Sequence, residues 1–450
     1  MFWNGGDRMR VYDIIDRKKK GYTMTKEEIV YLIEGYVKGE IPDYQVAAWL
    51  MAVYYQGMTD EELLNLTLTM RDSGDQVDLS AIHGIKVDKH STGGVGDKTT
   101  IVIAPLVAAC GGKVAKMSGR GLGFTGGTID KLESIPGFTT AIEEKEFFRI
   151  VNEVGAAVIG QSAQIAPADK KLYALRDVTA TVDSIPLIAA SIMSKKLAAG
   201  SDKIVLDVTV GSGAFMKSME EAITLSRKMI AIGEGAGKET IALVTNMDVP
   251  LGNAIGNSLE VKEAIETLQG KGPQDFTEIC YVFASYLLVK SGVCDTLEEA
   301  RAKAEKAIQS GKALDQFAMM VNMQGGDAEY IYHPEHFASA EYTRKLLAQN
   351  DGFVTSLNTE ACGVASVALG AGREKKDDPI DYAAGIRICK KTGDAVKAGD
   401  VLAVLYACDS KKLEAGEKIL RSAYQISENP GTIHRHVLAY VSQKEVIRYE

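Results

Sequence analysis

The stretch KHSTGGVGDKTT, residues Lys89–Thr100, decides the fold class of this chain. It follows the apolar-alternating segment Ile85–Asp88 and precedes the apolar segment Ile101–Val107, so the order predicts a β-strand, a glycine-rich loop and an α-helix. Glycines let the backbone curl so that successive N–H groups face one point, and a helix N-terminus adds partial positive charge there. We therefore expect this loop to bind an anion such as phosphate.

The side chains of the loop suit the same chemistry. Lys89 carries a full positive charge, and Ser91 and Thr100 are neutral hydrogen-bond donors. His90 is the residue whose unperturbed pKa, about 6.5, lies near neutrality. The loop thus combines an anion site with a group that can exchange a proton.

A second unit of the same kind follows directly. Lys113–Met117 has the pattern of a strand, and Ser118–Thr128 is another glycine loop before a helix. In a parallel sheet, such loops emerge side by side at the carboxyl ends of adjacent strands. The two loops can then hold one anion from two sides.

Two nucleotide-binding motifs resemble these loops without matching them fully. A nucleoside-triphosphate P-loop has glycine directly before its lysine, whereas Asp97 precedes Lys98 here. Gly121–Gly126 matches the dinucleotide pattern, which also requires an acidic residue at the end of a second strand about 20 residues on. Ile142–Ile150, at that distance, has helical periodicity instead. The other alternative is that both loops are tight turns without a ligand.

Composition sets the broad class of the protein. A chain of 450 residues with 46% apolar residues predicts two or three domains with ample core. The net charge of −9 argues against a nucleic-acid partner, so an anion site must be a local positive pocket. The 6 cysteines have no CxxC spacing, which indicates neither a disulfide framework nor a zinc site.

The sequence predicts a cytoplasmic protein with no membrane partner. No apolar run reaches the length of about 18 residues that a membrane-spanning helix needs, and the N-terminus lacks the pattern of a signal peptide. The first residues do not share the amphipathic pattern that begins at Met9, and we hypothesise that translation starts there and not at Met1.

The chain from Met9 to Ser73 has helical patterns throughout. Thr25–Glu28 and Thr59–Glu62 are capping boxes, each with a hydroxyl cap and a glutamate three residues later. The helix predicted over Pro42–Tyr55 is apolar on more than one face, so it must be buried by its own domain or by a second subunit. This pattern favours a homodimer.

A second helical block spans residues 170–200. It contains Tyr173, Arg176, Ser191 and Lys195. Ser191 and Lys195 are four residues apart and therefore share one helix face. Taken singly, Arg176 and Lys195 could equally be solvated or salt-bridged surface charges.

The C-terminal part differs in character. Gly385–Tyr406 has short alternating strands with Gly-Asp turns, a pattern that resembles the barrel-sandwich fold of biotinyl domains. No Met-Lys-Met tripeptide offers a lysine for biotin, so we expect a structural cap and no organic cofactor.

Together these motifs resemble the thymidine and pyrimidine-nucleoside phosphorylases. The resemblance is carried by Lys89–Gly94, Met117–Gly123, Thr125–Gly137 and Tyr173–Lys196, and it covers essentially everything after Met9. It implies an α/β fold class: a small all-helical domain hinged to a large mixed α/β domain, with a C-terminal barrel-sandwich-like α+β subdomain. It also implies a homodimer formed through the helical domain.

The expected domain boundaries follow from the same resemblance. Residues 1–73 and 170–200 would form the helical domain, which binds the base. Residues 82–169 and 201–342 would form the α/β domain, which binds phosphate. Residues 343–450 would form the C-terminal subdomain, packed on the α/β domain.

The resemblance also implies the site residues. Inorganic phosphate would be held by Lys89, Ser91, Thr100, Lys116, Met117 (through its backbone), Ser118 and Thr128. The pyrimidine would be bound by Tyr173, Arg176, Ser191 and Lys195. The catalytic residues would be His90, Arg176 and Lys195.

The implied reaction is the reversible attack of a phosphate oxygen on the sugar's anomeric carbon in uridine, 2′-deoxyuridine or thymidine. Its products are the free base and (deoxy)ribose 1-phosphate. Arg176, Lys195 and a protonated His90 would stabilise the negative charge that builds on the departing base. The alternative role for His90 is to orient a phosphate ligand.

A potassium site is also implied, with counterparts here at Gly96, Lys98, Leu251, Ala254 and Glu263. Position 98 is usually threonine in this family, so the Lys98 ammonium either competes with the cation or points away. Phe124 and Thr209 are two further departures, from a usual histidine and a usual lysine. We expect them to affect sugar preference and domain closure.

Three other functions stay open on the sequence. One is a phosphorylase specific for thymidine. Another is a phosphoribosyltransferase of the anthranilate type, which shares a related helical plus α/β arrangement but needs a magnesium-diphosphate site and lacks the C-terminal barrel. The last is a non-catalytic nucleoside-binding protein, which would not need the chemistry of Lys89 and His90.

Overall fold

The computed structural model describes residues 9–449 apart from residues 122, 374, 376 and 377. Residues 1–8, on which the choice of start residue depends, therefore lie outside the described part, as does Leu122 of the second glycine loop.

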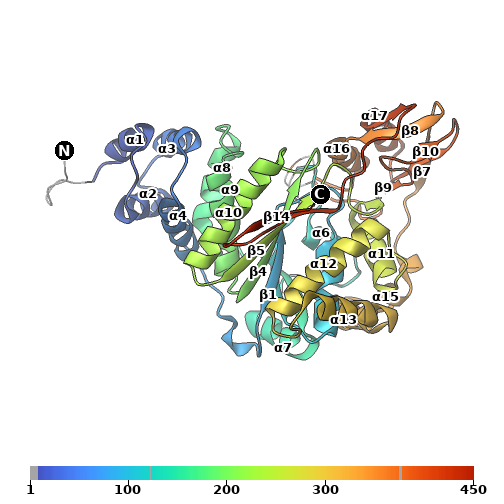
Figure 1. The fold of residues 1–450 in the computed structure, drawn as a ribbon, viewed down its shortest axis with the longest axis horizontal. Coiled ribbons are helices and arrows are strands. Elements are labelled where there is room, and N and C mark those ends of the chain that lie inside the picture. The colour runs from blue at the N-terminus through green and yellow to red at the C-terminus, as the bar shows by residue number, and fades with distance from the viewer. Residues whose placement is uncertain (1–8, 122, 374, 376–377, 450) are drawn as a thin grey trace.

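A helical part forms one end of the molecule (Figure 1). Thr25 and Thr59 form the predicted capping boxes at the starts of two of its helices. Two helices from the middle of the chain return to pack against the N-terminal ones. The helices are α1 (Val11–Lys19), α2 (Lys26–Lys38), α3 (Asp43–Gln56), α4 (Asp60–Asp72), α8 (Pro167–Asp177) and α9 (Ile185–Ala198).

The central sheet has the strand order β1-β4-β5-β13-β14. Its first three strands are parallel, and the last two add to the edge of β5 as an antiparallel hairpin. Beside β1, β2 and β3 form a separate parallel pair. The strands are β1 (Val87–Ser91), β2 (Val114–Ser118), β3 (Ala156–Gly160), β4 (Lys203–Val210), β5 (Glu239–Asn246), β13 (Val437–Val441) and β14 (Val446–Arg448).

The sheet stands between two layers of helices (Figure 1). On one face, α10 (Met219–Gly235) packs on β4 and β5 and also contacts α4 and α9, which joins the helical part to the sheet. On the other face lies α12 (Gln274–Lys290), which packs against α5 (Thr99–Ala109), a helix buried at every residue. The remaining helices of this layer are α6 (Thr128–Leu132), α7 (Glu144–Val154), α11 (Asn257–Leu268), α13 (Leu297–Gln309), α14 (Lys312–Met323) and α15 (Glu329–Tyr332).

Successive residues of a strand point to opposite faces, and this alternation divides the core. Ile204, Leu206 and Val208 of β4 join the cluster that contains the helical part, whereas Val205 joins the cluster around α12. The same alternation in β1 sends Val87 toward α12. It determines which side chains can reach the helical part.

Two small antiparallel sheets and two helices make up most of the C-terminal domain, around a hydrophobic core of their own. One sheet also takes in β6 (Ala254–Ile255) from the α/β domain. The elements are β7 (Tyr342–Leu347), β8 (Gly352–Leu357), α16 (Thr359–Leu369), β9 (Gly385–Ile388), β10 (Ala395–Val396), β11 (Val401–Ala407), α17 (Ser410–Ala423) and β12 (Tyr424–Ser427). The expected fold class, a helical domain, an α/β domain and a C-terminal α+β subdomain, is confirmed.

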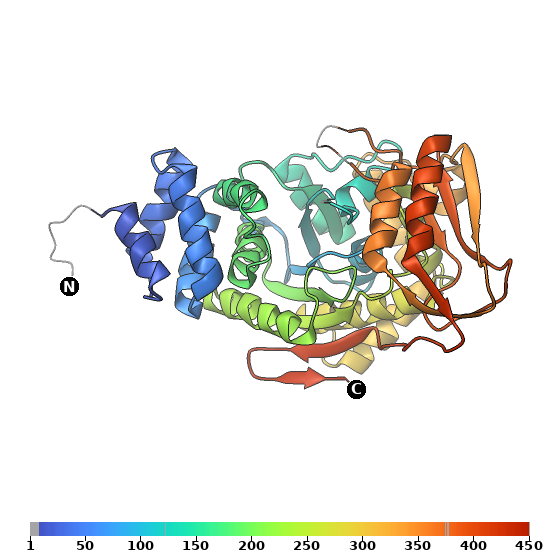
Figure 2. The same cartoon turned by 90° about the horizontal axis from the view of Figure 1, so that it is seen from above.

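The end of the chain departs from the expected domain boundary. Residues 437–448 do not stay with the C-terminal domain but form the β13–β14 hairpin on the central sheet (Figure 2). Without this hairpin, β5 would be an edge strand with unpaired N–H and C=O groups. None of the described helices is long and apolar enough to cross a membrane.

Candidate active site

A cavity of about 320 Å³ lies between the two glycine loops and the helical part. The loops after β1 and β2 form one wall, and α8 and α9 form the other. The predicted residues that line it are His90, Ser91, Thr100, Lys116, Ser118 and Thr128 on the loop side and Tyr173, Arg176, Ser191 and Lys195 on the helical side. Lys89 and Met117, both in the described part of the chain, lie outside its wall.

A larger cavity, of about 890 Å³, lies elsewhere, between the ends of β4 and β5 and the C-terminal domain. It is lined by none of the residues predicted to bind phosphate or base, all of which the structure describes. The smaller cavity is therefore the candidate active site.

Lys89 points away from the cavity because of its position in β1. Like Val87, it faces α12, where its Nζ lies 5.1 Å from the ring of Phe283. Burial disfavours the ammonium, but Asp207 and Asp97, at 2.6 and 3.6 Å from Nζ, together keep its pKa above the usual value. Lys89, predicted to contact phosphate, thus does not face the cavity but neutralises carboxylates beneath the loop.

Asp97 is likewise part of the loop's framework. Its Oδ1 accepts hydrogen bonds from Thr99 N at 3.2 Å and Thr99 Oγ1 at 2.5 Å. Burial opposes ionisation, but Lys89 and Lys131 hold the pKa of this carboxyl well below its usual value. The carboxylate that sets this loop apart from nucleoside-triphosphate loops thus binds Thr99, the first residue of α5.

A buried carboxylate between two lysines, Lys116 and Lys196, forms a floor beneath the cavity, and of these three residues only Lys116 lines the cavity itself. Asp88 Oδ1 is 3.0 Å from Lys116 Nζ, and its Oδ2 is 2.9 Å from Lys196 Nζ. Lys196 also donates to the Met117 carbonyl at 3.1 Å. Burial lowers the pKa of Lys116 to about 8, with Asp88 opposing the shift and Lys196 adding to it. Two ammonium groups and one carboxylate leave a net positive charge beside the loops.

The electrostatics of this floor act on His90. The ring is half-buried and lines the cavity, and burial lowers its pKa well below the usual value. Lys196 and Lys116 lower it further, and Asp88 offsets only part of the shift. Burial, together with these two ammonium groups, therefore favours the neutral imidazole in the free protein, and the role of His90 as an acid in the reacting complex stays a prediction.

Arg176 is built into the opposite wall and is only 2% exposed. Its guanidinium donates to the carbonyls of Thr181, Val182 and Leu187 at 3.3, 2.6 and 3.2 Å. It also lies 5.5 Å from the centre of the Tyr173 ring. These bonds fix the orientation of the remaining N–H groups, so Arg176 is not a solvated surface charge.

Lys195 and Ser191 share a face of α9, as their spacing predicts. The Lys195 ammonium donates to Ser191 Oγ at 3.0 Å and pairs with Asp169 of α8. The other carboxylate oxygen of Asp169 is buried without a hydrogen-bond partner. Asp169 therefore orients Lys195 toward the cavity, a role that the sequence did not reveal.

Thr209 and Phe124, the two further departures from the family pattern, have structural roles. Thr209 Oγ1 donates to the Gly93 carbonyl at 2.5 Å, and Thr209 N donates to Thr92 Oγ1 at 3.0 Å, so the end of β4 is tied to the first glycine loop. Phe124 packs against α16, where a Cβ on Gly363 would meet its ring at 2.9 Å. It thereby connects the second loop to the C-terminal domain.

The residues expected to hold potassium converge, but around the ammonium of Lys98. Lys98 Nζ donates to the carbonyls of Leu251 and Ala254 and pairs with Glu263, so three of the predicted potassium ligands already bind an ammonium. This arrangement does not fit a potassium ion. Among the described residues, no group of three or more His, Cys, Asp or Glu side chains could hold a metal ion.

Comparison with known proteins extends over nearly the whole chain. Three family descriptions match: "Glycosyl transferase family, helical bundle domain" over residues 12–74, "Glycosyl transferase family, a/b domain" over 83–314 and "Pyrimidine nucleoside phosphorylase C-terminal domain" over 353–427. Among solved structures, anthranilate phosphoribosyltransferase from Thermus thermophilus is similar in fold. It has a TM-score of 0.57 and 18% identity, covering 69% of this chain and 99% of that one.

Two curated relatives are much more similar in sequence. The pyrimidine-nucleoside phosphorylase of Staphylococcus aureus (strain MSSA476) is 53% identical over 433 residues, which cover 96% of this chain and 100% of that protein. The pyrimidine-nucleoside phosphorylase of Geobacillus stearothermophilus is 53% identical over 422 residues, which cover 94% and 97%. The chain therefore belongs to the pyrimidine-nucleoside phosphorylase family.

Proposed function

We propose that the protein catalyses the reversible phosphorolysis of pyrimidine nucleosides to free base and (deoxy)ribose 1-phosphate. The observation that carries this proposal is a single cavity with two anion loops and Lys116 at one side and Arg176 and Lys195 at the other. The names of the close relatives support the same reaction. Uridine, 2′-deoxyuridine and thymidine are the proposed substrates.

Phosphate is proposed to bind at the loop side of the cavity. Hydroxyl groups and loop N–H groups would donate hydrogen bonds to its oxygens, while the excess ammonium charge at the floor attracts the anion. Lys116 of β2 lines this side of the cavity, whereas Lys89 of β1 does not. The proposed phosphate contacts are Ser91, Thr100, Lys116, Ser118 and Thr128.

The base is proposed to bind at the helical side. A phosphate oxygen forms a bond to the anomeric carbon as the bond from that carbon to the ring nitrogen breaks, and the bonding electrons go to the pyrimidine. Arg176 and Lys195 stabilise the resulting negative charge, and their fixed orientation means that little reorganisation is needed as it forms. Ser191 and Tyr173 complete the wall that contacts the ring.

His90 is proposed to become protonated only when phosphate binds. In the free protein its pKa is low, chiefly because of burial and next because of Lys196 and Lys116. A phosphate dianion beside the ring adds the opposite charge and raises the pKa of the imidazole. Protonated His90, which would donate its proton to the leaving pyrimidine, would thus form in the complex with phosphate, where the reaction takes place.

One assay tests the proposed function. Uridine, 2′-deoxyuridine and thymidine are each incubated with the protein, with and without phosphate, and base release is followed by chromatography. Release that requires phosphate is expected, and release from thymidine alone would narrow the substrate class. No phosphate-dependent release from any of the three would contradict the proposal. A parallel incubation of anthranilate with phosphoribosyl diphosphate tests the transferase alternative.

The pH dependence of phosphate use should report the pKa of Lys116. Below about pH 8 its ammonium is charged in the free enzyme, and above that pH it is lost, so kcat/KM for phosphate should fall as pH rises through about 8. In Lys116→Arg this alkaline limb should move beyond the measurable range, because a guanidinium stays charged. An alkaline limb unchanged in Lys116→Arg would show that another group titrates.

We also infer a homodimer formed through the helical part. Tyr12 of α1 and Tyr44 and Tyr55 of α3 are 68%, 74% and 77% exposed, and exposed aromatic side chains are typical of protein interfaces. Light scattering after size exclusion should give twice the chain mass, and Tyr44→Lys with Tyr55→Lys should shift it toward the monomer. A wild-type protein that is monomeric at micromolar concentration would contradict this inference.

A further inference from the structure

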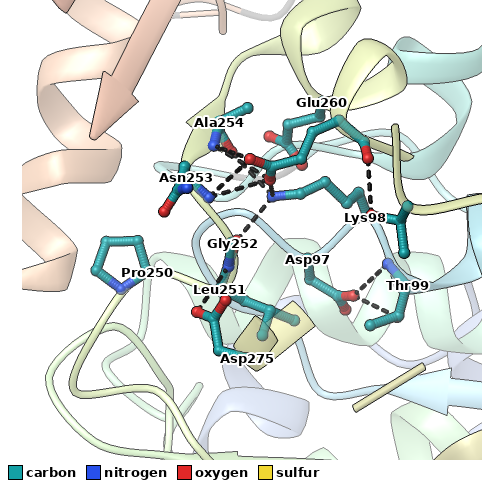
Figure 3. A network of polar contacts seen from close by, with 12 residues as sticks. Asp97, Lys98, Thr99, Pro250, Leu251, Gly252, Asn253, Ala254, Glu260 and Asp275 are labelled. Carbon is teal, nitrogen blue, oxygen red and sulfur yellow. Dashed lines mark hydrogen bonds and ion pairs between the residues drawn. The ribbon is translucent and has the colours of Figure 1, made fainter. Parts of the chain in front are cut away.

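The ammonium of Lys98 lies at the centre of a buried set of oxygen atoms (Figure 3). Lys98 Nζ is 2.7 Å from the Leu251 carbonyl oxygen, 3.0 Å from the Ala254 carbonyl oxygen and 2.8 Å from Glu263 Oε2. The Lys98 side chain is 0% exposed, and Nζ also lies 5.1 Å from the ring centre of Phe276. All three N–H groups of the ammonium can therefore be satisfied within the protein.

The carboxylate that balances this charge is itself fixed by the backbone. Glu263 Oε1 accepts hydrogen bonds from Asn253 N at 2.9 Å and Ala254 N at 3.1 Å. The loop therefore holds both carbonyls and the carboxylate in one orientation, facing Nζ. Carbonyl and carboxylate oxygens are the ligands that hard cations take, so this is a cation site whose occupant is a side chain.

A free potassium ion does not fit beside this ammonium. It would need the same carbonyl and carboxylate oxygens and would therefore lie directly beside Lys98 Nζ. In a buried site, two positive charges that share the same ligands repel each other strongly. Gly252 and Gly96 approach the site closely as well: a Cβ on Gly252 would lie 2.9 Å from Nζ, and one on Gly96 would lie 2.5 Å from the Leu251 oxygen. The site has no room for a second cation at these ligands.

We propose that the Lys98 ammonium is a tethered replacement for a monovalent cation, so that the folded phosphate loop of this protein does not require potassium. Lys98 directly precedes α5 and belongs to the first glycine loop, whereas its oxygen partners lie on the 251–254 segment and α11. It therefore ties the loop to the body of the α/β domain. The claim that the site binds no free potassium does not rest on the proposed function, whereas the expected effect on the phosphate KM does.

A second lysine supports the same connection from the neighbouring side. Lys131 Nζ donates to the Asp97 carbonyl at 2.6 Å and pairs with Glu260 Oε2 at 2.7 Å. The loop thus has two buried charged anchors on α11, through Glu260 and Glu263. Lys98 is a positioning residue for the phosphate loop, since it does not line the candidate active site.

The test compares ions at constant ionic strength. Wild-type protein is dialysed into tetramethylammonium chloride, and its melting temperature and phosphate KM are measured as this salt is replaced by potassium, sodium or lithium chloride. We expect the potassium and tetramethylammonium curves of the wild type to coincide. A wild type that potassium stabilises, or whose phosphate KM needs potassium, would overturn the proposal.

The variant Lys98→Thr should create the dependence that the wild type lacks. It leaves the Glu263 carboxylate buried without a counter-charge, so in tetramethylammonium chloride we expect a lower melting temperature and a phosphate KM raised by about tenfold. Potassium, but not lithium, should restore both. A folded Lys98→Thr protein that is indifferent to potassium would overturn the proposal.

Two controls separate ion binding from general damage. Lys262→Met removes the lysine of α11, whose Nζ lies 5.6 Å from the Phe337 ring and not in the cation site, and should give no potassium dependence. Adding Glu263→Gln to Lys98→Thr removes the charge that needs a cation, so the potassium effect on melting should disappear. If no nucleoside is cleaved in any salt, the proposed function fails while the melting curves still decide the ion proposal.

Discussion

Replacing Arg176 by glutamine is expected to lower kcat/KM for uridine by about 10²- to 10³-fold, the loss that follows removal of one preorganised donor to a developing anion. Three backbone carbonyls, those of Thr181, Val182 and Leu187, hold the guanidinium in place before substrate arrives. The remaining N–H groups therefore act on the negative charge of the departing base without a large reorganisation. Steady-state kinetics with uridine and phosphate measures the loss.

Two further variants make this result specific. Arg176→Lys keeps the charge but lacks the planar fork, so it should recover only part of the activity. Arg227→Gln removes an exposed arginine of α10 that is outside the cavity and should leave kcat/KM unchanged. Because Arg176→Gln also leaves three carbonyls without their donor, its melting temperature is recorded beside the kinetics. A folded Arg176→Gln enzyme with unchanged kcat/KM would exclude the assigned role.

Replacing Asp88 by asparagine is expected to destabilise the protein by about 3–5 kcal/mol, because removing one partner leaves buried charge uncompensated. Lys116 and Lys196 would face each other across a neutral amide, both buried. Urea unfolding at pH 7 measures the change. Asp202→Asn is the matched control: that carboxylate is 35% exposed beside Lys86, so its loss should cost about 0–1 kcal/mol.

The deficit of Asp88→Asn should shrink as pH rises. The unfolded chain keeps the Lys116 proton up to a pH of about 10.4, whereas the folded protein releases it near a pKa of about 8. Between these values the unfolded state binds more protons, so the folded wild type gains stability with rising pH. Because Asp88 raises the pKa of Lys116, its removal lowers that pKa further, so the variant begins to gain stability at a lower pH than the wild type and the deficit shrinks. Loss of the Lys116 charge also removes its repulsion with Lys196. A deficit that grows between pH 7 and pH 9 would contradict this charge assignment.

The local features of the fold could be predicted because they depend on neighbouring residues. The capping boxes at Thr25 and Thr59, and the strand–loop–helix order around the two glycine loops, follow from spacings of a few residues. The C-terminal hairpin could not be predicted in the same way. Residues 437–441 pair with β5 across nearly two hundred residues of sequence, and no local pattern indicates which strand edge they cover.

The site could be predicted in its composition but not in its electrostatics. The resemblance correctly brought together Ser191, Lys195 and the two loops in one cavity. The inward direction of Lys89 depends on the pairing of β1 with β4, which places Asp207 beside it. The low pKa of His90 likewise depends on burial and then on Lys196, a residue of α9 more than a hundred positions away. The spacing of residues along the sequence does not indicate such long-range pairs.

Phosphorus-31 NMR of a mixture of protein, uridine and inorganic phosphate shows whether phosphate is the nucleophile. We expect the signal of a sugar 1-phosphate ester to grow in step with free uracil while the signal of inorganic phosphate falls. The ester should also be consumed when uracil is added in excess, because the reaction is reversible. Uracil released while the phosphate signal stays constant would mean that water attacks the sugar, and it would contradict phosphorolysis in this cavity.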